Sequence, residues 1–356
     1  MRVTRLTPLP GRASPHGTVS REMNVLLLVD GGLVEVLQAS PLLRSLVAGL
    51  DGADVTVACA PAAAPVAAQI PGVTEALALP ALAPHGATPR NALRAWGALR
   101  RRRFHAAAVC SEHPLGAALA YFAGIPRRSG LATGPASLLL TDRVEGEGDE
   151  NRAATWLRLA SALGVEQQLH QPSYNPGVPA RLAAEQRMLA SGFEDGRLMV
   201  ALAPGSGFAD PMPLVARRSL AWEPERFAHL CNQLTRRHGA GIVVLGTAED
   251  RASVEAMMLD VESSVLDLCA ELESLAEVAA VLERCDLLVC GDSPLLHLAA
   301  AVGTPSVGLF GPTSGRVRAP YGEGHRVVQS LQATSSLRGI RVDDVLAGIE
   351  AEGRVT

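Results

Sequence analysis

The stretch GDSPLLHLAAAVGTPSVGLFGPT, residues 291–313, decides the fold of this chain. It predicts the end of a strand, a helix, a second strand over Ser306 to Phe310 and a turn that contains glycine. Asp292 and Ser293 stand at the start of the helix, and His297 lies one turn further on. Apolar strands separated by helices are typical of a parallel sheet covered on both faces, so we expect an α/β fold.

Strands and helices alternate in this way twice along the chain. The candidate strands are Val25 to Val29, Asp54 to Cys59, His105 to Cys110, Met199 to Ala203, Gly241 to Leu245, Leu287 to Cys290 and Ser306 to Phe310. The pattern predicts two facing, doubly wound Rossmann-like domains with a cleft between them, where open sheets bind ligands. We place the first domain at 23–170, a connection at 171–197, the second domain at 198–340 and a last helix in 341–356.

The composition excludes several classes of protein. The 356 residues are 48% hydrophobic, and 32 arginines with no lysine face 36 acids, for a net charge of −4. This balance argues against a nucleic-acid binder. No apolar run approaches the roughly 20 residues of a membrane span. The six cysteines show no CxxC pair, which favours buried thiols in a reducing compartment. Residues 1–22 lack a secretory signal and read as a disordered tail or a misassigned start.

Two further loops of the second half follow predicted strands. Gly205-Ser206-Gly207 comes after Met199 to Ala203, and small residues there leave backbone amides available to phosphate oxygens. Glu249 and Asp250 begin the helix after the next strand, where an acid can accept hydrogen bonds from a ribose diol. Capping of that helix explains these two acids equally well.

In the first half, Gly31 and Gly32 follow the first strand and lead into a helix that starts near Leu33 and runs through Pro41 to Leu50. Glu35 lies in the first turn of this helix, where the helix dipole favours a negative charge. Glu35 is therefore a candidate functional carboxylate facing the cleft. The alternative is that it only complements the helix dipole.

The 291–313 block resembles the signature of glycosyltransferase family 9, the lipopolysaccharide heptosyltransferases, which is roughly D-S-G-P-M-H-L-A-A-A-L-G-T-P followed by F-G-P-T. Ser40 to Leu46 is similar to the first helix of that family, the PGSG loop to its first loop in the second domain, and Glu273 to Leu282 to the helix before the signature strand. The resemblance covers about residues 24–350. It implies a GT-B fold.

The resemblance also implies an activity: inverting, metal-independent transfer of a heptose from a nucleotide diphosphate to the lipopolysaccharide inner core. The expected donor is ADP-heptose, a substrate, and no cofactor is expected. Glu35 would be the general base, and Gly31 and Gly32 would contact the acceptor. The implied donor-binding residues are Gly205, Ser206, Gly207, Arg217, Arg218, Glu249, Asp292, Ser293, His297, Gly311 and Thr313.

The sequence departs from the family pattern at two important positions. The family base is an aspartate six residues before the helix proline, and counting back from Pro41 gives Glu35. The family lysine before Trp-Pro has no equivalent beside Trp222, so we expect Arg217 or Arg218 to contact the donor phosphates. Pro294 and Leu295 also replace the usual Gly-Pro of the signature. These departures bear on the donor sugar rather than on the fold.

Residues 76–111 contain no acid and six arginines, namely Arg90, Arg94 and Arg100 to Arg103. This composition suits an anionic acceptor, with Arg90 and Arg94 as candidate contacts, or a phosphate-bearing membrane surface. A solvated helix end is the alternative. The expected acceptor is lipid A or an inner-core glycolipid, and the expected location is the cytoplasm, at the inner face of the cytoplasmic membrane.

Two other functions remain open at this point. A nucleotide-sugar 2-epimerase shares the GT-B architecture but needs several acids and histidines around the sugar, and this sequence offers few. A degenerate family member that binds a nucleotide or glycan without turnover is consistent with Glu35 and with the missing lysine.

Overall fold

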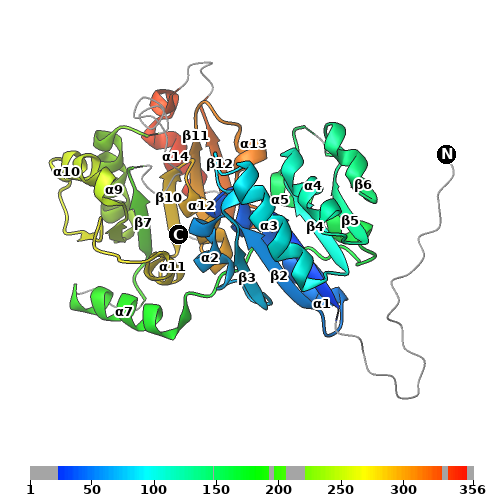
Figure 1. Ribbon diagram of the computed structural model, residues 1–356. Helices are drawn as coiled ribbons and strands as arrows, with labels where there is room; N and C mark the ends of the chain where they lie inside the picture. The colour runs from blue at the N-terminus through cyan, green and yellow to red at the C-terminus, as the bar shows by residue number, and fades with distance from the viewer. Residues whose placement is uncertain (1–22, 147, 192–195, 206–220, 331–335, 351–356) are drawn as a thin grey trace. The chain divides into compact units, whose positions relative to one another are not determined.

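The computed structural model describes residues 23–146, 148–191, 196–205, 221–330 and 336–350. The chain divides into two compact units, Met1–His170 and Gln171–Thr356. In the described part of each unit, six parallel strands form one sheet with helices packed against it (Figure 1). The segment predicted as the connection belongs to the second unit and contains helix α7, Gly177–Ala190.

The sheet of the first unit has the strand order β3-β2-β1-β4-β5-β6. Its strands are β1 Asn24–Val29, β2 Asp54–Cys59, β3 Glu75–Ala78, β4 Ala106–Cys110, β5 Arg127–Leu131 and β6 Asp142–Val144. Its helices are α1 Leu33–Gly49, α2 Ala64–Ala67, α3 Pro89–Arg102, α4 Pro114–Phe122, α5 Arg152–Leu157 and α6 Leu159–Ala162. The central strand β1 is buried over Val25 to Val29, which explains its uninterrupted apolar sequence.

Helices cover both faces of this sheet, because successive side chains of a strand point to opposite faces. Leu26 and Leu28 of β1 belong to one apolar cluster with Leu99 of α3 and Leu119 of α4. Figure 1 shows α3 lying in front of the sheet. Helix α1 packs against α5. The core thereby fixes the loops that follow each strand.

Pro41 lies inside helix α1 and lacks the amide hydrogen that would bond to the carbonyl of Leu37. The hydroxyl of Ser40 donates to that carbonyl oxygen instead, at 2.7 Å. The hydroxyl of Ser45 donates to the carbonyl oxygen of Pro41 at 3.1 Å. These bonds satisfy buried carbonyls, so the helix continues through the proline as predicted.

The sheet of the second unit has the order β12-β11-β10-β7-β8-β9. Its strands are β7 Met199–Ala203, β8 Gly241–Val244, β9 Leu266–Asp267, β10 Leu287–Gly291, β11 Ser306–Phe310 and β12 His325–Gln329. Its remaining helices are α9 Pro224–His238, α10 Arg251–Met258, α11 Leu275–Glu283, α12 Pro294–Val302, α13 Gly315–Arg318 and α14 Val342–Glu350. Trp222 and Phe227 pack edge to face in its core, with ring centroids 5.0 Å apart.

The two sheets have the same topology. If the strands of each unit are numbered from one to six along the chain, both sheets have the order 3-2-1-4-5-6. The chain starts in the middle, builds outward to one edge, returns to the middle and builds to the other edge. The strand order therefore reverses between β1 and β4 in the first unit and between β7 and β10 in the second. Ligands of doubly wound sheets bind beyond the carboxyl ends of the strands at such a reversal. The predicted pair of Rossmann-like domains is confirmed.

All six cysteines lie in described segments, and all are free and buried, as predicted. Burial raises the pKa of the Cys59 and Cys290 thiols to about 12. They are therefore protonated near neutral pH and act as small apolar side chains rather than as nucleophiles.

Candidate active site

The first candidate site lies where the strand order of the first unit reverses. A pocket of about 260 Å³ opens beyond the carboxyl ends of β1 and β4. Its polar lining comes from the loops after these two strands, from α1 and from α5: Asp30, Glu35, Ser111, Glu112, His113 and Arg152. A small pocket with several carboxylates and a histidine has the composition of a site for proton transfer.

Glu35 lines this pocket and is half-buried. Its Oε2 accepts a hydrogen bond from the backbone amide of Gly32 at 2.8 Å. Gly31 has φ +115°, and a Cβ atom there would lie 2.7 Å from the Cδ of Glu35. Glycine is therefore required for the loop to fold so closely over this carboxylate. Glu35 does complement the helix start, and it also faces a pocket, so the two interpretations of this residue do not exclude each other.

The loop after β4 supplies a part of this pocket that was not predicted from the sequence. The hydroxyl of Ser111 donates to Oδ2 of Asp30 at 3.1 Å. Glu112 forms an ion pair with Arg152, 3.4 Å between Oε1 and Nη2. A signal was present, because Ser-Glu-His follows one candidate strand just as Asp-Gly-Gly follows another. Only the sheet order shows that these two strands are neighbours.

The candidate donor residues lie in the second unit, where its strand order reverses between β7 and β10. Gly205 follows β7, and a Cβ atom there would lie 1.9 Å from Oδ1 of Asp250. The loop after β7 is therefore packed directly against the start of the helical segment after β8. Ser206, Gly207, Arg217 and Arg218 lie outside the described residues.

Asp250 and Glu249 have different surroundings. Asp250 is buried, and its Oδ2 accepts hydrogen bonds from the amide and the hydroxyl of Thr247, at 2.9 and 3.0 Å. Asp250 thus caps the helical start, as the structural interpretation of these acids predicted. Glu249 is exposed beside it. Of the two, Glu249 has the more accessible carboxylate for a ligand.

Asp292 and Ser293 lie at the end of β10 and the start of α12. Oδ2 of Asp292 forms an ion pair with Nε of Arg318 at 2.7 Å, and the aspartate side chain is 2% exposed whereas the arginine side chain is 51% exposed. Ser293 occupies the N-cap position, but its side chain makes no capping hydrogen bond within the described part of the chain. The position of Ser293 at the start of the helix is confirmed, but a capping role for its side chain is not observed. Arg318 was not among the residues singled out from the sequence.

His297 is buried in the first turns of α12, near the same ion pair. Loss of solvation lowers the pKa of His297 to about 4, and the nearby charge of Asp292 only partly opposes this effect. Arg318 and His325 lower the pKa of His297 further. The imidazole is therefore neutral near pH 7, and one ring nitrogen donates while the other accepts.

Gln329 of β12 fixes the loop that contains Gly311 and Thr313. Its Nε2 donates to the carbonyl oxygens of Gly311 and Thr313, at 3.0 and 3.2 Å, and its Oε1 accepts from the amide of Gly315. A Cβ atom on Gly311 would lie 2.9 Å from the backbone of Ser336. The Thr313 hydroxyl oxygen is buried and has no partner within the described segments. Gln329 was not among the candidate residues, because it lies in a strand that was not predicted.

Arg90 and Arg94 are exposed on α3 and do not line the Glu35 pocket. Among the described residues, His, Cys, Asp and Glu side chains form no group of three that could hold a metal ion. Within the same residues, no helix is both long and apolar enough to cross a bilayer.

Comparison with known proteins identifies the family. The model of glycosyltransferase family 9 (heptosyltransferase) matches residues 92–340. Lipopolysaccharide heptosyltransferase 2 of Salmonella typhimurium is 27% identical over 327 residues, which cover 89% of this chain and 90% of that protein.

Solved structures agree with this assignment of the fold. The family 9 glycosyltransferase from Veillonella parvula has a TM-score of 0.78 at 18% identity, covering 93% of this chain and 97% of that chain. The E. coli ADP-heptose lipopolysaccharide heptosyltransferase II has a TM-score of 0.72 at 22% identity, covering 93% and 98%. The predicted GT-B fold is confirmed. Because the family model matches more than half of its residues, the chain belongs to glycosyltransferase family 9, the heptosyltransferases, and is a glycosyltransferase.

Proposed function

We propose that this protein transfers a heptose from ADP-heptose to an inner-core sugar of lipopolysaccharide, with inversion at the anomeric carbon and without a metal ion or another cofactor. The relative from Salmonella is named for lipopolysaccharide heptose transfer, and the E. coli structure is named for ADP-heptose. The observation that carries the proposal is the Glu35 carboxylate in a pocket at the strand reversal of the first unit.

Glu35 acts as the general base in this proposal. It removes the proton from the acceptor hydroxyl, and the oxygen attacks the anomeric carbon on the face opposite the diphosphate. The bond from that carbon to the diphosphate oxygen breaks, ADP leaves with the bonding electrons, and the configuration inverts. General-base assistance of this kind contributes about 10²- to 10⁴-fold to the rate.

The second unit binds the donor and stabilises the leaving diphosphate. Because the Ser293 side chain does not cap α12, the amides of its first turn are suited to phosphate oxygens. Gly205 to Gly207 and the loop of Gly311 and Thr313 contribute further contacts, His297 contributes a neutral hydrogen-bonding group, and Glu249 binds the ribose. Asp292 contributes through its ion pair with Arg318, because its own side chain is only 2% exposed.

Arginine supplies the positive charge that relatives take from lysine. Arg217 or Arg218 remains the expected contact to the diphosphate. Arg318, the last residue of α13, adds a third candidate, because it pairs with Asp292 just before α12 and exposes about half of its side chain. A guanidinium binds phosphate through two parallel hydrogen bonds, which makes a metal ion unnecessary.

The acceptor binds the first unit through Gly31, Gly32, Arg90 and Arg94. Helix α3 runs antiparallel to the strands, since it connects the carboxyl end of the β3 region to the amino end of β4. The first turns of α3, which carry Arg90 and Arg94, therefore lie on the side of the carboxyl ends of the strands, as Glu35 does. Their exposed charges suit the phosphate groups of a lipid A or inner-core acceptor, and the enzyme would work in the cytoplasm at the inner face of the membrane.

A binding protein without turnover is the remaining alternative, since Glu35 replaces the aspartate that the family uses. The extra methylene can displace the carboxylate by about 1 Å, a change that can cost about a hundredfold in rate. The close fold of Gly31 over Glu35 and the bond from Gly32 favour an adapted loop over a decayed one. The family match does not favour the epimerase alternative.

The experiment that tests the proposal incubates the full-length protein with ADP-heptose and lipopolysaccharide that lacks heptose. We expect the acceptor mass to increase by one heptose with release of ADP, and we expect EDTA to leave the rate unchanged. The anomeric configuration of the product, read by NMR, tests inversion. ADP binding without product would support the binding-only alternative instead.

A further inference from the structure

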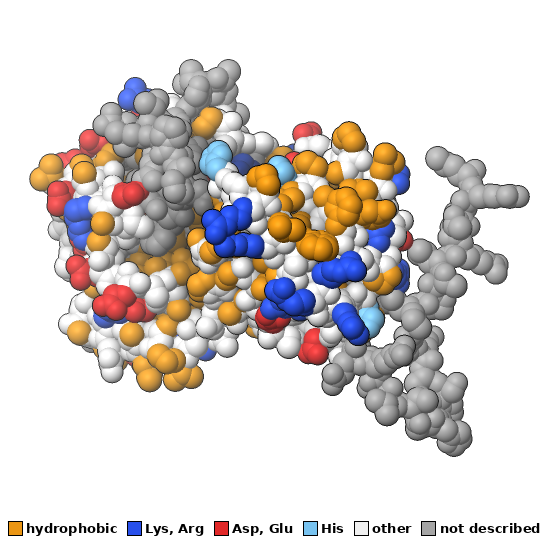
Figure 2. Space-filling model, in the orientation of Figure 1, with side chains coloured by type: hydrophobic (Ala, Val, Ile, Leu, Met, Phe, Trp, Pro, Cys, Tyr) orange, Lys and Arg blue, Asp and Glu red, His pale blue; other side chains and the backbone are white. Residues whose placement is uncertain are grey.

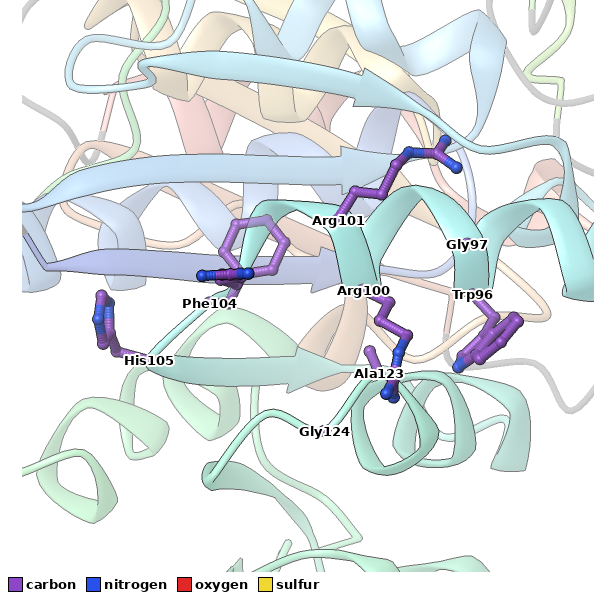
Figure 3. A pocket seen from close by; sticks show the side chains of 9 residues that line it. Trp96, Gly97, Arg100, Arg101, Phe104, His105, Ala123 and Gly124 are labelled. Carbon is purple, nitrogen blue, oxygen red and sulfur yellow. The ribbon is translucent and has the colours of Figure 1, made fainter.

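A second pocket of the first unit lies at the end of the sheet opposite to the Glu35 pocket, beside the amino ends of the strands. It measures about 910 Å³ and is formed by the end of α3, the turn into β4 and the end of α4 (Figure 3). Its side chains include Arg100, Arg101, Arg103 and His105, and none of its lining residues is acidic. Since His105 directly precedes β4, this pocket lies at the amino ends of the strands, whereas the Glu35 pocket lies at their carboxyl ends.

Trp96 orients the side chain of Arg100 in this pocket. The indole nitrogen of Trp96 donates to the carbonyl oxygen of Phe122 at 2.8 Å, which fixes the indole ring. The guanidinium of Arg100 lies over that ring, 5.8 Å from its centroid, and reaches toward Ala123 and Gly124 in Figure 3. Such a cation–π contact holds the charge in place.

His105 offers a hydrogen-bond donor to the same pocket. Its Nδ1 accepts a hydrogen bond from the backbone amide of Asn24 at 3.0 Å. Because Nδ1 acts as the acceptor, the ring proton of the neutral imidazole lies on Nε2. This nitrogen donates together with the guanidinium groups.

The adjacent Arg102 differs from the arginines of the pocket, because its side chain is held by structural hydrogen bonds. Its Nε donates to Oε2 of Glu75 at 2.8 Å, and its Nη1 donates to the carbonyl oxygen of Ala98 at 2.9 Å. Arg102 therefore already complements the negative end of the helix dipole. Arg100, Arg101 and Arg103 have no carboxylate partner among the residues that the structure describes.

Arg103 occupies a backbone position that favours glycine. It ends α3 in the left-handed conformation, with φ +51° and ψ +53°. Glycine is the usual residue at such a helix end, because a Cβ atom is unfavourable there. An arginine with a strained backbone at the rim of a pocket points to a function for its side chain.

We infer that this pocket is a second anion site, one that binds a phosphate group through Arg100, Arg103 and His105, while Arg101, which points away from Arg100 in Figure 3, adds positive charge at its border. Three cations that line one pocket without a counter-ion repel one another, and a phosphate removes this repulsion while it accepts several charge-assisted hydrogen bonds. The site is separate from the transfer chemistry, because Glu35 lies beyond the carboxyl ends of the strands and this pocket lies at their amino ends.

Two sources present this chemistry: the headgroup of an anionic lipid and a soluble phosphorylated compound. Figure 2 shows basic side chains gathered over α3, with apolar side chains among them. Tyr121 and Phe122, which come just before the pocket residue Ala123, are exposed, with Phe122 61% exposed. Arginines interleaved with exposed aromatic side chains are typical of a surface that contacts lipid headgroups.

The test titrates pyrophosphate into the full-length protein and into the variant R100Q/R103Q. A matched control is R143Q/R236Q, which removes the same charge from exposed positions on β6 and α9. We expect a class of sites in the wild type and the control whose affinity falls about tenfold or more in R100Q/R103Q. Pyrophosphate bound in the donor unit stays the same in all three proteins. Equal isotherms for all three proteins would overturn the inference.

A second arm separates the two sources. The same three proteins are sedimented with phosphatidylcholine vesicles that either contain or lack phosphatidylglycerol. Binding that requires phosphatidylglycerol and is lost in R100Q/R103Q supports the site with a lipid headgroup as its ligand. No vesicle binding, together with the pyrophosphate result, supports it with a soluble ligand. If vesicles bind R100Q/R103Q as well as they bind the wild type and pyrophosphate affinity is also unchanged, the inference fails.

The variant Arg103→Gly tests independently whether the Arg103 side chain binds the phosphate. Because glycine relieves the left-handed backbone, we expect this variant to unfold at a higher urea concentration than the wild type and yet to bind pyrophosphate more weakly. A higher midpoint with unchanged pyrophosphate affinity would contradict a role for Arg103. Heptose transfer to a detergent-dispersed acceptor should be unaffected, so failure of this inference and failure of the transfer function are distinguishable.

Discussion

His297 links the charge state of one buried side chain to the stability of the whole second unit. Its pKa is about 4 in the folded protein, against 6.5 for an ordinary histidine. Between these two values, the unfolded chain binds a proton that the folded chain does not, so the free energy of unfolding falls as the pH is lowered from 6.5 to about 4. The total loss is roughly 3 kcal/mol.

Urea unfolding of the wild type and of His297→Asn at a series of pH values measures this effect. We expect the difference between the two curves to change by roughly 3 kcal/mol across this window and to be constant above pH 7. Carboxylates titrate in both proteins and therefore cancel in the difference. Parallel curves throughout would mean that His297 is not a buried neutral group.

Individual residues also show where sequence reasoning about the site ends. Glu35, Asp292 and His297 were found because each follows a recognisable strand and helix start. Ser111, Arg152 and Arg318 were missed because their roles depend on contacts between segments that lie far apart in the chain. The neighbour of each loop depends on the strand order, which no local pattern specifies.

At the scale of elements, the loop after β7 packs closely against Asp250, which caps the helical segment after β8. Gly205→Ala would place a methyl group on the carboxylate of Asp250, and overpacking of this kind costs about 1–3 kcal/mol. Asp250→Ala removes the cap of Thr247, at about 1–2 kcal/mol.

The double variant G205A/D250A distinguishes direct contact from two independent effects. Because Asp250→Ala removes the atoms that the new methyl group would meet, we expect the double variant to lose less stability than the sum of the single variants, by at least about 0.5 kcal/mol. Gly148→Ala, where a Cβ atom meets nothing within 4 Å, is a nearly neutral control. Simple additivity in urea unfolding would contradict the close contact.

The buried central strands were predictable from the sequence, whereas the four edge strands and the interior strand β5 were not. The apolar strands β1, β2, β4, β7, β8, β10 and β11 were expected within one residue of their observed ends. The missed strands β3, β5, β6, β9 and β12 are short, charged or partly exposed, such as Arg127–Leu131 and His325–Gln329. Their strand conformation comes from pairing with a neighbour already in the sheet, a tertiary effect that outweighs local propensity.

At the scale of the whole molecule, we expect donor binding to stabilise the protein by a free energy that increases with the logarithm of the affinity. ADP at about 100 times its dissociation constant adds about 2.7 kcal/mol to the free energy of unfolding. We expect ADP to raise the melting temperature of the full-length protein more than UDP or GDP does at the same concentration. Equal shifts with all three nucleotides would remove the preference for the adenine base.

In the proposed mechanism, the second unit binds the donor, and Glu35 of the first unit activates the acceptor. The most direct test measures heptose transfer and ADP affinity for wild type, Glu35→Gln and Glu35→Asp. We expect Glu35→Gln to lose about 10²- to 10⁴-fold in turnover with ADP affinity nearly unchanged. Glu35→Asp should also be impaired, because the loop of Gly31 and Gly32 is folded on the longer side chain. Equal turnover by all three proteins would show that Glu35 only complements the helix start, and the central claim would fail.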